Sequence, residues 1–194
     1  MQVFVLAVEY PGYSLYKSQT EISESQLIQD GETVVNCMIE KYRINPSRII
    51  IVGRSLGSGI ACALASRFRP AGLILISPLK SIQEVAKEHY GTLTAMFVKD
   101  RFNNAKYISQ AQCPVLIVHG PQDKLVPLAH AQELQGRIMF TKRIVPFVML
   151  HGHSGRDDSW DRQHPSRNHQ TSIRLSTTDW VQDKRGSSAD LLLS

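Results

Sequence analysis

Seven residues, Gly53-Arg54-Ser55-Leu56-Gly57-Ser58-Gly59, separate two segments that predict different secondary structures. The apolar run 49–52 before them is typical of a buried strand, and the alanine-rich run 60–65 after them is typical of a helix. A strand that turns sharply into a helix through G-x-S-x-G is the context of a nucleophile elbow. The motif therefore predicts a serine hydrolase in which Ser55 is the nucleophile and the backbone N–H of Leu56 faces an oxyanion. A structural Gly/Ser turn is the alternative.

The bulk composition is that of one soluble globular domain. The chain has 194 residues, of which 42% are hydrophobic and 20% charged, and its net charge of +5 is not gathered into one block, which argues against nucleic-acid binding. No apolar run approaches the roughly 20 residues of a membrane helix. The single cysteines Cys37, Cys62 and Cys113 predict reduced core thiols in a cytoplasmic protein. We expect neither a metal site nor a cofactor.

Short apolar runs alternate with helical patterns along the chain. The runs are continuous rather than alternating, which is typical of a parallel sheet covered by helices on both faces. This order predicts a doubly wound α/β sheet. The expected strands are 3–8, 49–53, 73–77, 115–119 and 144–150, and the expected helices are 27–42 with Ser25 as its cap, 61–68, 81–89 and 128–134.

The character of the sequence changes near Arg156. The residues that follow are polar, their positive and negative charges balance, and they show no periodicity. We therefore expect a folded domain over residues 1–155 and a poorly ordered polar tail over 156–194.

A nucleophilic serine needs a base and an orienting carboxylate. Asp123 follows the predicted strand 115–119, so it emerges at the same sheet edge as Ser55 and is the candidate acid. A loop aspartate that caps the next helix is the alternative interpretation. The base is expected last in the chain order. We favour His153, in a flexible Gly-His-Ser setting after the last strand, and retain His151 as the alternative base. His130 is expected to be a surface residue of a helix.

Several motifs in order give a resemblance to a known family. The elbow, Tyr10-Pro11-Gly12-Tyr13, Ser77-Pro78-Leu79, and Cys113-Pro114 followed by His119-Gly120 and Asp123 resemble the α/β-hydrolase superfamily over residues 3–135. They are most similar to the branch of protein depalmitoylases called alpha/beta hydrolase domain-containing protein seventeen. The resemblance implies an α/β-hydrolase fold and hydrolysis of an ester or thioester through an acyl-enzyme. The implied substrate is a small molecule or an acylated protein, which allows peripheral membrane contact.

The resemblance also has departures. Family members carry a His-Gly-Asn turn before the strand that corresponds to residues 3–8, and this turn supplies the second oxyanion donor. The sequence begins at that strand, so we expect a fold that lacks the first strands. Two other functions therefore stay open. One is a catalytically impaired remnant or interaction protein without the oxyanion loop, and the other is a serine aminopeptidase-like hydrolase.

Two segments beside the predicted site have open roles. Residues 10–13 leave a strand at the carboxyl edge and either line the mouth of a pocket or form an ordinary turn. Residues 80–111 carry several large apolar side chains. They form either a lid or acyl-binding wall, or a connecting segment with a cluster of its own.

Overall fold

The computed structural model describes residues 3–13, 16, 22–138, 147–149 and 176–177. The helices are α1 (Glu24–Glu40), α2 (Gly57–Phe68), α3 (Ile82–Tyr90), α4 (Thr92–Ala95), α5 (Asn104–Ile108) and α6 (Leu128–Gly136), with a 3-10 turn η1 (Pro46–Arg48). The strands are β1 (Ile50–Arg54), β2 (Gly72–Ile76), β3 (Val115–His119), β4 (Phe147–Met149) and β5 (Ser176–Thr177).

The strands form one sheet with the order β1-β2-β3-β4-β5. The pairs from β1 to β4 are parallel, and β5 is antiparallel to β4. Arg54 pairs with Ile76 and Ile76 with Val118, so the carboxyl ends of β1, β2 and β3 lie at the same edge of the sheet. This arrangement confirms the predicted α/β sheet. The predicted strands after residue 48 all form. The ends of β1 and β2 each differ from the prediction by one residue, β3 matches it, and the ends of the predicted strand 144–150 lie outside the described residues.

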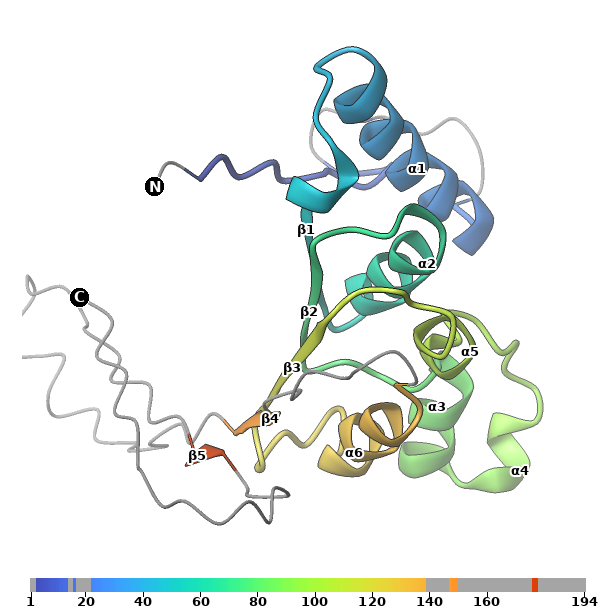
Figure 1. The fold of residues 1–194 in the computed structure, drawn as a ribbon. Helices are drawn as coiled ribbons and strands as arrows, with labels where there is room; N and C mark the ends of the chain where they lie inside the picture. The colour runs from blue at the N-terminus through green and yellow to red at the C-terminus, as the bar shows by residue number, and fades with distance from the viewer. Residues whose placement is uncertain (1–2, 14–15, 17–21, 139–146, 150–175, 178–194) are drawn as a thin grey trace, which may run out of the picture.

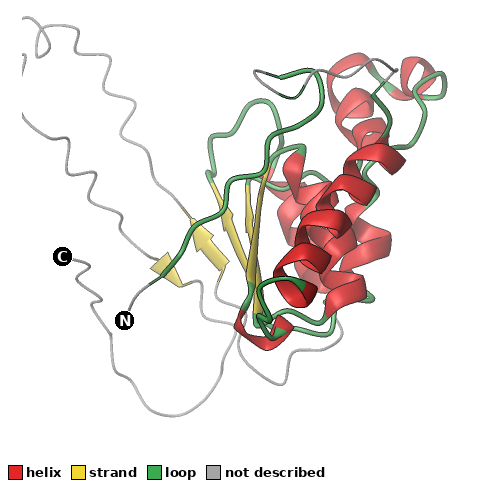
Figure 2. Cartoon of the chain, turned by 90° about the horizontal axis from the view of Figure 1, so that it is seen from above, coloured by secondary structure: helices red, strands yellow, loops and turns green. Residues whose placement is uncertain are grey.

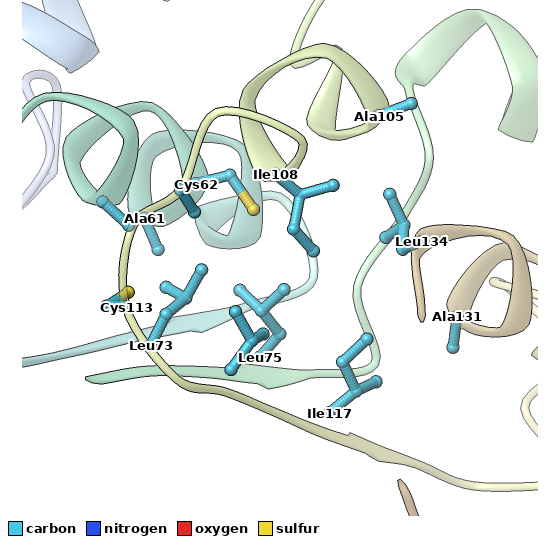
Figure 3. Close-up of a cluster of buried hydrophobic side chains, with 13 residues drawn as sticks. Ala61, Cys62, Leu73, Leu75, Ala105, Ile108, Cys113, Ile117, Ala131 and Leu134 are labelled. Carbon is cyan, nitrogen blue, oxygen red and sulfur yellow. The ribbon is translucent and has the colours of Figure 1, made fainter. Parts of the chain in front are cut away.

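The helices of the described ranges lie on one face of this sheet (Figures 1 and 2), whereas the sequence predicts helices on both faces. Side chains of β2 and β3 alternate between this face and the other, as strands require. Leu73, Leu75 and Ile117 point into the helical layer and are almost fully buried. They pack against α2, α5 and α6 in a core (Figure 3) that includes Ala61, Cys62, Ala65, Ala105, Ile108, Ala131 and Leu134. The other face is more open, and Ile50 and Val52 of β1 are each 58% exposed.

The prediction of a buried strand over Val3–Val8 is wrong. These residues belong to no strand, and the side chains of Phe4 and Val5 are 92% and 89% exposed. A β-branched run becomes a strand only when neighbouring backbone accepts its hydrogen bonds. Within the described chain no strand lies alongside it to do so.

Local residues determine the start of α1 and the end of α2. The cap of α1 is Ser23, whose hydroxyl accepts from the N–H of Gln26 at 3.2 Å, so the expected cap at Ser25 is wrong by two residues. Ser25 lies inside the first turn instead. Helix α2 ends at Phe68, as the sequence predicts, and its C-cap Arg69 adopts the left-handed conformation with φ 47° before Pro70.

The cysteines divide into two groups. Cys62 and Cys113 are buried in the core, whereas Cys37 is exposed on α1, so the expectation of core thiols fails for Cys37. Burial raises the pKa of the Cys113 thiol to about 11, and burial together with Cys113 raises the pKa of Cys62 as well. The two core thiols are therefore uncharged at neutral pH.

Candidate active site

Ser55 sits in a strained turn between β1 and α2. Its φ of 49° is in the left-handed region, which non-glycine residues rarely adopt and which costs on the order of 1–2 kcal/mol. The turn is fixed by the N–H of Ser55, which donates to the carbonyl of Ile76 at 2.9 Å. The side chain is partly exposed. The strand, strained turn and helix that a nucleophile elbow requires are therefore present, and the nucleophilic role of Ser55 stays a prediction.

The glycines of the motif are required by close approach. A Cβ on Gly53 would lie 2.6 Å from both the carbonyl oxygen of Gly57 and the Cβ of Ala61, and one on Gly59 would lie 2.6 Å from the Phe102 side chain. Such distances are too short for any real side chain. Glycine at these positions therefore lets β1, α2 and the segment around Phe102 come together around Ser55.

The first turn of α2 is held by Ser58. Its hydroxyl and its N–H both donate to the carbonyl of Ser55, at 2.5 and 3.0 Å. Leu56 is the N-cap of α2, and its side chain is 38% exposed. Among the described residues the N–H groups of Ser55, Ser58 and Gly59 have backbone acceptors around this turn, and that of Leu56 has none. The N–H of Leu56 therefore remains at the positive end of α2, where an anion is favoured.

Asp123 lies in the loop after β3. Its Oδ1 accepts from the N–H groups of Leu125 and Val126, both at 2.9 Å. Burial of the carboxyl acts to raise its pKa, but those two N–H groups, the Ser77 hydroxyl and His119 outweigh burial, so the net pKa is lowered. Asp123 is therefore ionised at neutral pH. The alternative of an aspartate that caps the next helix is wrong, because the N-cap of α6 is Pro127 without a side-chain cap, and Asp123 holds the loop before that helix instead.

Ser77 connects the loops after β2 and β3. It follows β2 directly, has a positive φ of 45°, and donates its N–H to the carbonyl of Val118 at 2.8 Å. Its hydroxyl helps to lower the pKa of the Asp123 carboxyl. The Ser77-Pro78-Leu79 motif is visible in the sequence, but its contact with β3 leaves no local pattern because it depends on the register of β2 against β3.

Two histidines near the carboxyl edge of the sheet are buried and already hydrogen-bonded to backbone groups. The ring of His119 is fully buried, its Nε2 donates to the carbonyl of Val126 at 2.8 Å, and the same nitrogen lies 3.9 Å from Oδ2 of Asp123. His130 is 4% exposed, and its Nδ1 accepts from the N–H of Lys80 at 3.0 Å, so the expected surface position of His130 is wrong. Burial is the main cause that lowers the pKa of His130. Neither ring is open to a substrate.

Tyr10 reaches the elbow from the N-terminal segment. A Cβ on Gly57 would lie 2.8 Å from the Tyr10 hydroxyl, so this hydroxyl sits against the start of α2. Burial raises the pKa of the Tyr10 phenol. Residues 10–13 also form a turn, in which the N–H of Tyr13 donates to the carbonyl of Tyr10 at 3.1 Å. The segment therefore forms an ordinary turn that also brings Tyr10 to the elbow, and its place at the mouth of a pocket stays a prediction.

Segment 80–111 presents an apolar surface around α4. Tyr90, Leu93, Met96 and Phe97 are all more than 70% exposed. His89, beside them, contacts the Asp123 loop through its Nε2, which lies 2.8 Å from the carbonyl oxygen of Leu125. The candidate bases His151 and His153 and most of the expected tail lie outside the described residues. No described group of His, Cys, Asp or Glu side chains is placed to hold a metal ion.

A mostly parallel sheet with helices packed on it, and a strained serine in the turn between its first strand and the next helix, is the arrangement of an α/β-hydrolase fold. The chain belongs to the α/β-hydrolase fold family, whose model matches residues 16–136. None of the described helices is long and apolar enough to cross a membrane.

The chain is similar to proteins of one branch of that family. It is 32% identical to alpha/beta hydrolase domain-containing protein 17B of Xenopus laevis over 130 residues, which cover 67% of this chain and 43% of the relative. The identity and coverage are the same for protein 17B of Homo sapiens. Protein 17C of Xenopus tropicalis is 32% identical over 69% of this chain and 41% of its own length. The chain thus spans less than half the length of these relatives.

Solved structures agree on the fold. An alpha-beta hydrolase from Vibrio vulnificus superposes with a TM-score of 0.57 at 24% identity, over 68% of this chain and 51% of that structure. The acylaminoacyl peptidase of Pyrococcus horikoshii superposes with a TM-score of 0.51 at 15% identity, over 65% of this chain and 23% of that structure.

Proposed function

We propose that this chain is a serine hydrolase that cleaves an ester or thioester through an acyl-enzyme. The observation that carries the proposal is the strained left-handed turn at Ser55, held between Ile76 and the first turn of α2. Strain of this kind persists where surrounding structure enforces it, and it clusters at active sites.

The roles of the residues follow from acyl-transfer chemistry. Ser55 Oγ attacks the acyl carbonyl carbon while its proton passes to the imidazole of His153, with His151 as the alternative base. The imidazolium returns that proton to the departing alcohol or thiol. Water then adds to the acyl-enzyme, releases the acid and restores the Ser55 hydroxyl. Asp123, ionised at neutral pH, orients the imidazole, and the N–H of Leu56 stabilises the oxyanion.

The substrate class is inferred from similarity to related proteins. The resemblance to the depalmitoylase branch, alpha/beta hydrolase domain-containing protein seventeen, favours a palmitoyl-protein thioester. The exposed apolar side chains around α4, near the Asp123 loop, suit an acyl chain or a membrane surface. We accordingly propose a cytoplasmic protein that acts at or near a membrane.

Covalent labelling with a fluorophosphonate probe tests the chemistry. We expect the purified chain to be labelled and the Ser55→Ala variant to stay unlabelled. A folded wild-type protein that remains unlabelled would contradict the proposal and favour a non-catalytic interaction protein.

Turnover assays then define the leaving group. We expect faster hydrolysis of a palmitoyl thioester than of a p-nitrophenyl ester of the same acyl chain. Preferential cleavage of an aminoacyl anilide would replace this assignment with the aminopeptidase-like one.

A further inference from the structure

We propose that Asn104 is a positioning residue that holds the turn at Ser55 in a fixed relation to the loop that carries Ser77. The proposal rests on the proposed function, because the turn matters only if Ser55 reacts. Asn104 starts α5, which lies beside α2 (Figure 1), and no part of its side chain is exposed.

The amide of Asn104 joins two distant segments. Its Nδ2 donates to the Ser58 hydroxyl at 2.7 Å and to the carbonyl of Leu79 at 2.6 Å. The backbone N–H of Asn104 also donates to the carbonyl of Lys80 at 2.9 Å. One buried residue therefore ties the first turn of α2 to the loop after β2.

The bond through Ser58 reaches the candidate nucleophile. The Ser58 hydroxyl has one hydrogen, which it donates to the carbonyl of Ser55 at 2.5 Å, so it can only accept from Asn104. The donors thus run in one direction, from Asn104 to Ser58 to Ser55. Both partners of Nδ2 are acceptors, so the side chain must supply two N–H groups. Only an amide of this size does so, since a carboxylate of the same shape has none.

The other end of the link reaches the strand that precedes the candidate acid. Leu79 and Lys80 continue from Ser77, whose N–H donates to the carbonyl of Val118 in β3 at 2.8 Å. The same loop is fixed by the N–H of Lys80, which donates to His130. Asn104 therefore couples the backbone of Ser55 to the loop after β2, which is bonded to the strand that leads to Asp123, and small misplacement of reacting groups lowers rates strongly.

Two further observations fit a role beyond packing. Oδ1 of Asn104 is buried without a hydrogen-bond partner among the described residues, an unfavourable arrangement that an apolar side chain would avoid. The ring of Phe102 packs on Gly59, where a Cβ would be 2.6 Å from it, and this contact brings the start of α5 to Ser58. The unpaired Oδ1 therefore accompanies an Nδ2 that makes two hydrogen bonds, one to Ser58 and one to Leu79.

The test compares Ser58→Ala and Asn104→Asp with matched controls. Ser66→Ala removes a hydroxyl that makes the same bond three residues back on α2, from Ser66 to the carbonyl of Ala63 at 2.7 Å. Asn103→Asp makes the same amide-to-carboxylate change next door, where the side-chain oxygen caps α5 by accepting from the N–H of Lys106. Fluorophosphonate labelling rates, kcat and KM for an ester, and thermal midpoints are measured for each variant.

We expect labelling and kcat to fall by about 10- to 100-fold in Ser58→Ala and Asn104→Asp at temperatures where both are folded, with KM within about twofold. Both controls keep the wild-type rates. Wild-type rates in Ser58→Ala and Asn104→Asp would overturn the proposal. If Asn104→Asp does not fold, Ser58→Ala alone decides it.

Amide hydrogen exchange separates this proposal from the proposed function. The N–H groups of Ser58 and Gly59 donate to the carbonyls of Ser55 and Leu56 within the turn. We expect them to exchange at least tenfold faster in Asn104→Asp than in Asn103→Asp. An unlabelled wild-type protein would contradict the hydrolase chemistry, while equal exchange in the two variants would contradict the positioning role.

Discussion

The backbone N–H of Ser55 donates to the carbonyl of Ile76 at 2.9 Å, so the turn after β1 is anchored on the last residue of β2. The next residue, Ser77, donates its N–H to the carbonyl of Val118 in β3 at 2.8 Å, and Asp123 follows in the loop after β3. The two candidate catalytic positions are therefore linked through the end of β2.

The strain at Ser55 predicts an unusual order of stabilities. Glycine adopts a φ of 49° without the steric cost that alanine meets, so Ser55→Gly is expected to unfold with a free energy about 1 kcal/mol higher than Ser55→Ala. Ser66, inside helix α2, provides the control, since Ser66→Gly is expected to be about 1 kcal/mol less stable than Ser66→Ala. Urea denaturation measures both pairs. The same order at the two sites would show that Ser55 is not strained.

Alanine at the close-packed glycines is expected to destabilise the fold. In Gly53→Ala the new Cβ meets the backbone oxygen of Gly57, and in Gly59→Ala it meets Phe102, each at 2.6 Å. Overpacking of this kind costs about 1–3 kcal/mol. Gly136→Ala is the control, because a Cβ there has nothing within 4 Å. Denaturation midpoints that fall equally in all three variants would contradict this account.

Asp123→Asn is expected to preserve the fold and abolish most of the activity. The asparagine oxygen can still accept from Leu125 and Val126, so the turn remains, whereas an orienting carboxylate is lost and kcat falls by about 10⁴-fold. Because the folded pKa of Asp123 is lowered, its contribution to stability is present above the unfolded pKa of 3.8 and is lost as pH falls through the folded pKa. Unfolding free energies from pH 7 to pH 3 should therefore fall less in the variant. A parallel fall in both proteins would argue against the ionised carboxylate.

The buried ring of His130 leads us to expect a second pH dependence of the free energy of unfolding, at higher pH than that of Asp123. Burial lowers its pKa from 6.5, so the unfolded chain binds the proton more readily than the folded one. Its contribution to stability is present above pH 6.5 and is lost as pH falls through the folded pKa. The ring also faces Glu88, Glu84, Lys80 and His119, so the test must isolate the imidazole itself.

The measurement is the slope of unfolding free energy between pH 7 and pH 5. We expect His130→Gln to flatten this slope. An unchanged slope in His130→Gln would show that another group titrates.

Local patterns predicted the centre of this fold well. The strand, turn and helix around Ser55 are adjacent in sequence, and their glycines carry the signal for close approach. Strand β3 places Asp123 at the same edge, because parallel strands share the direction of their carboxyl ends. In these cases the information lies within a few residues of the feature that it determines.

The errors concern contacts between distant segments. The burial of His130 depends on Lys80, 50 residues away, and the role of Asn104 depends on Ser58, 46 residues away. Neither contact leaves a local pattern. Val3–Val8 has the composition of a strand, yet strand formation depends on a neighbouring backbone that composition does not encode. At the start of α1 both Ser23 and Ser25 are suitable cap residues. Only the backbone conformation shows that the hydroxyl of Ser23 accepts from the N–H of Gln26.

The turn after β3 also dictates the direction from which a base can approach. Oδ1 of Asp123 already serves two backbone N–H groups, and the imidazole of His119 is engaged with the carbonyl of Val126. In the proposed triad, the histidine therefore meets the carboxylate at Oδ2. The loop between β3 and α6, residues 120–127, thus fixes the side of Asp123 from which the proposed base approaches.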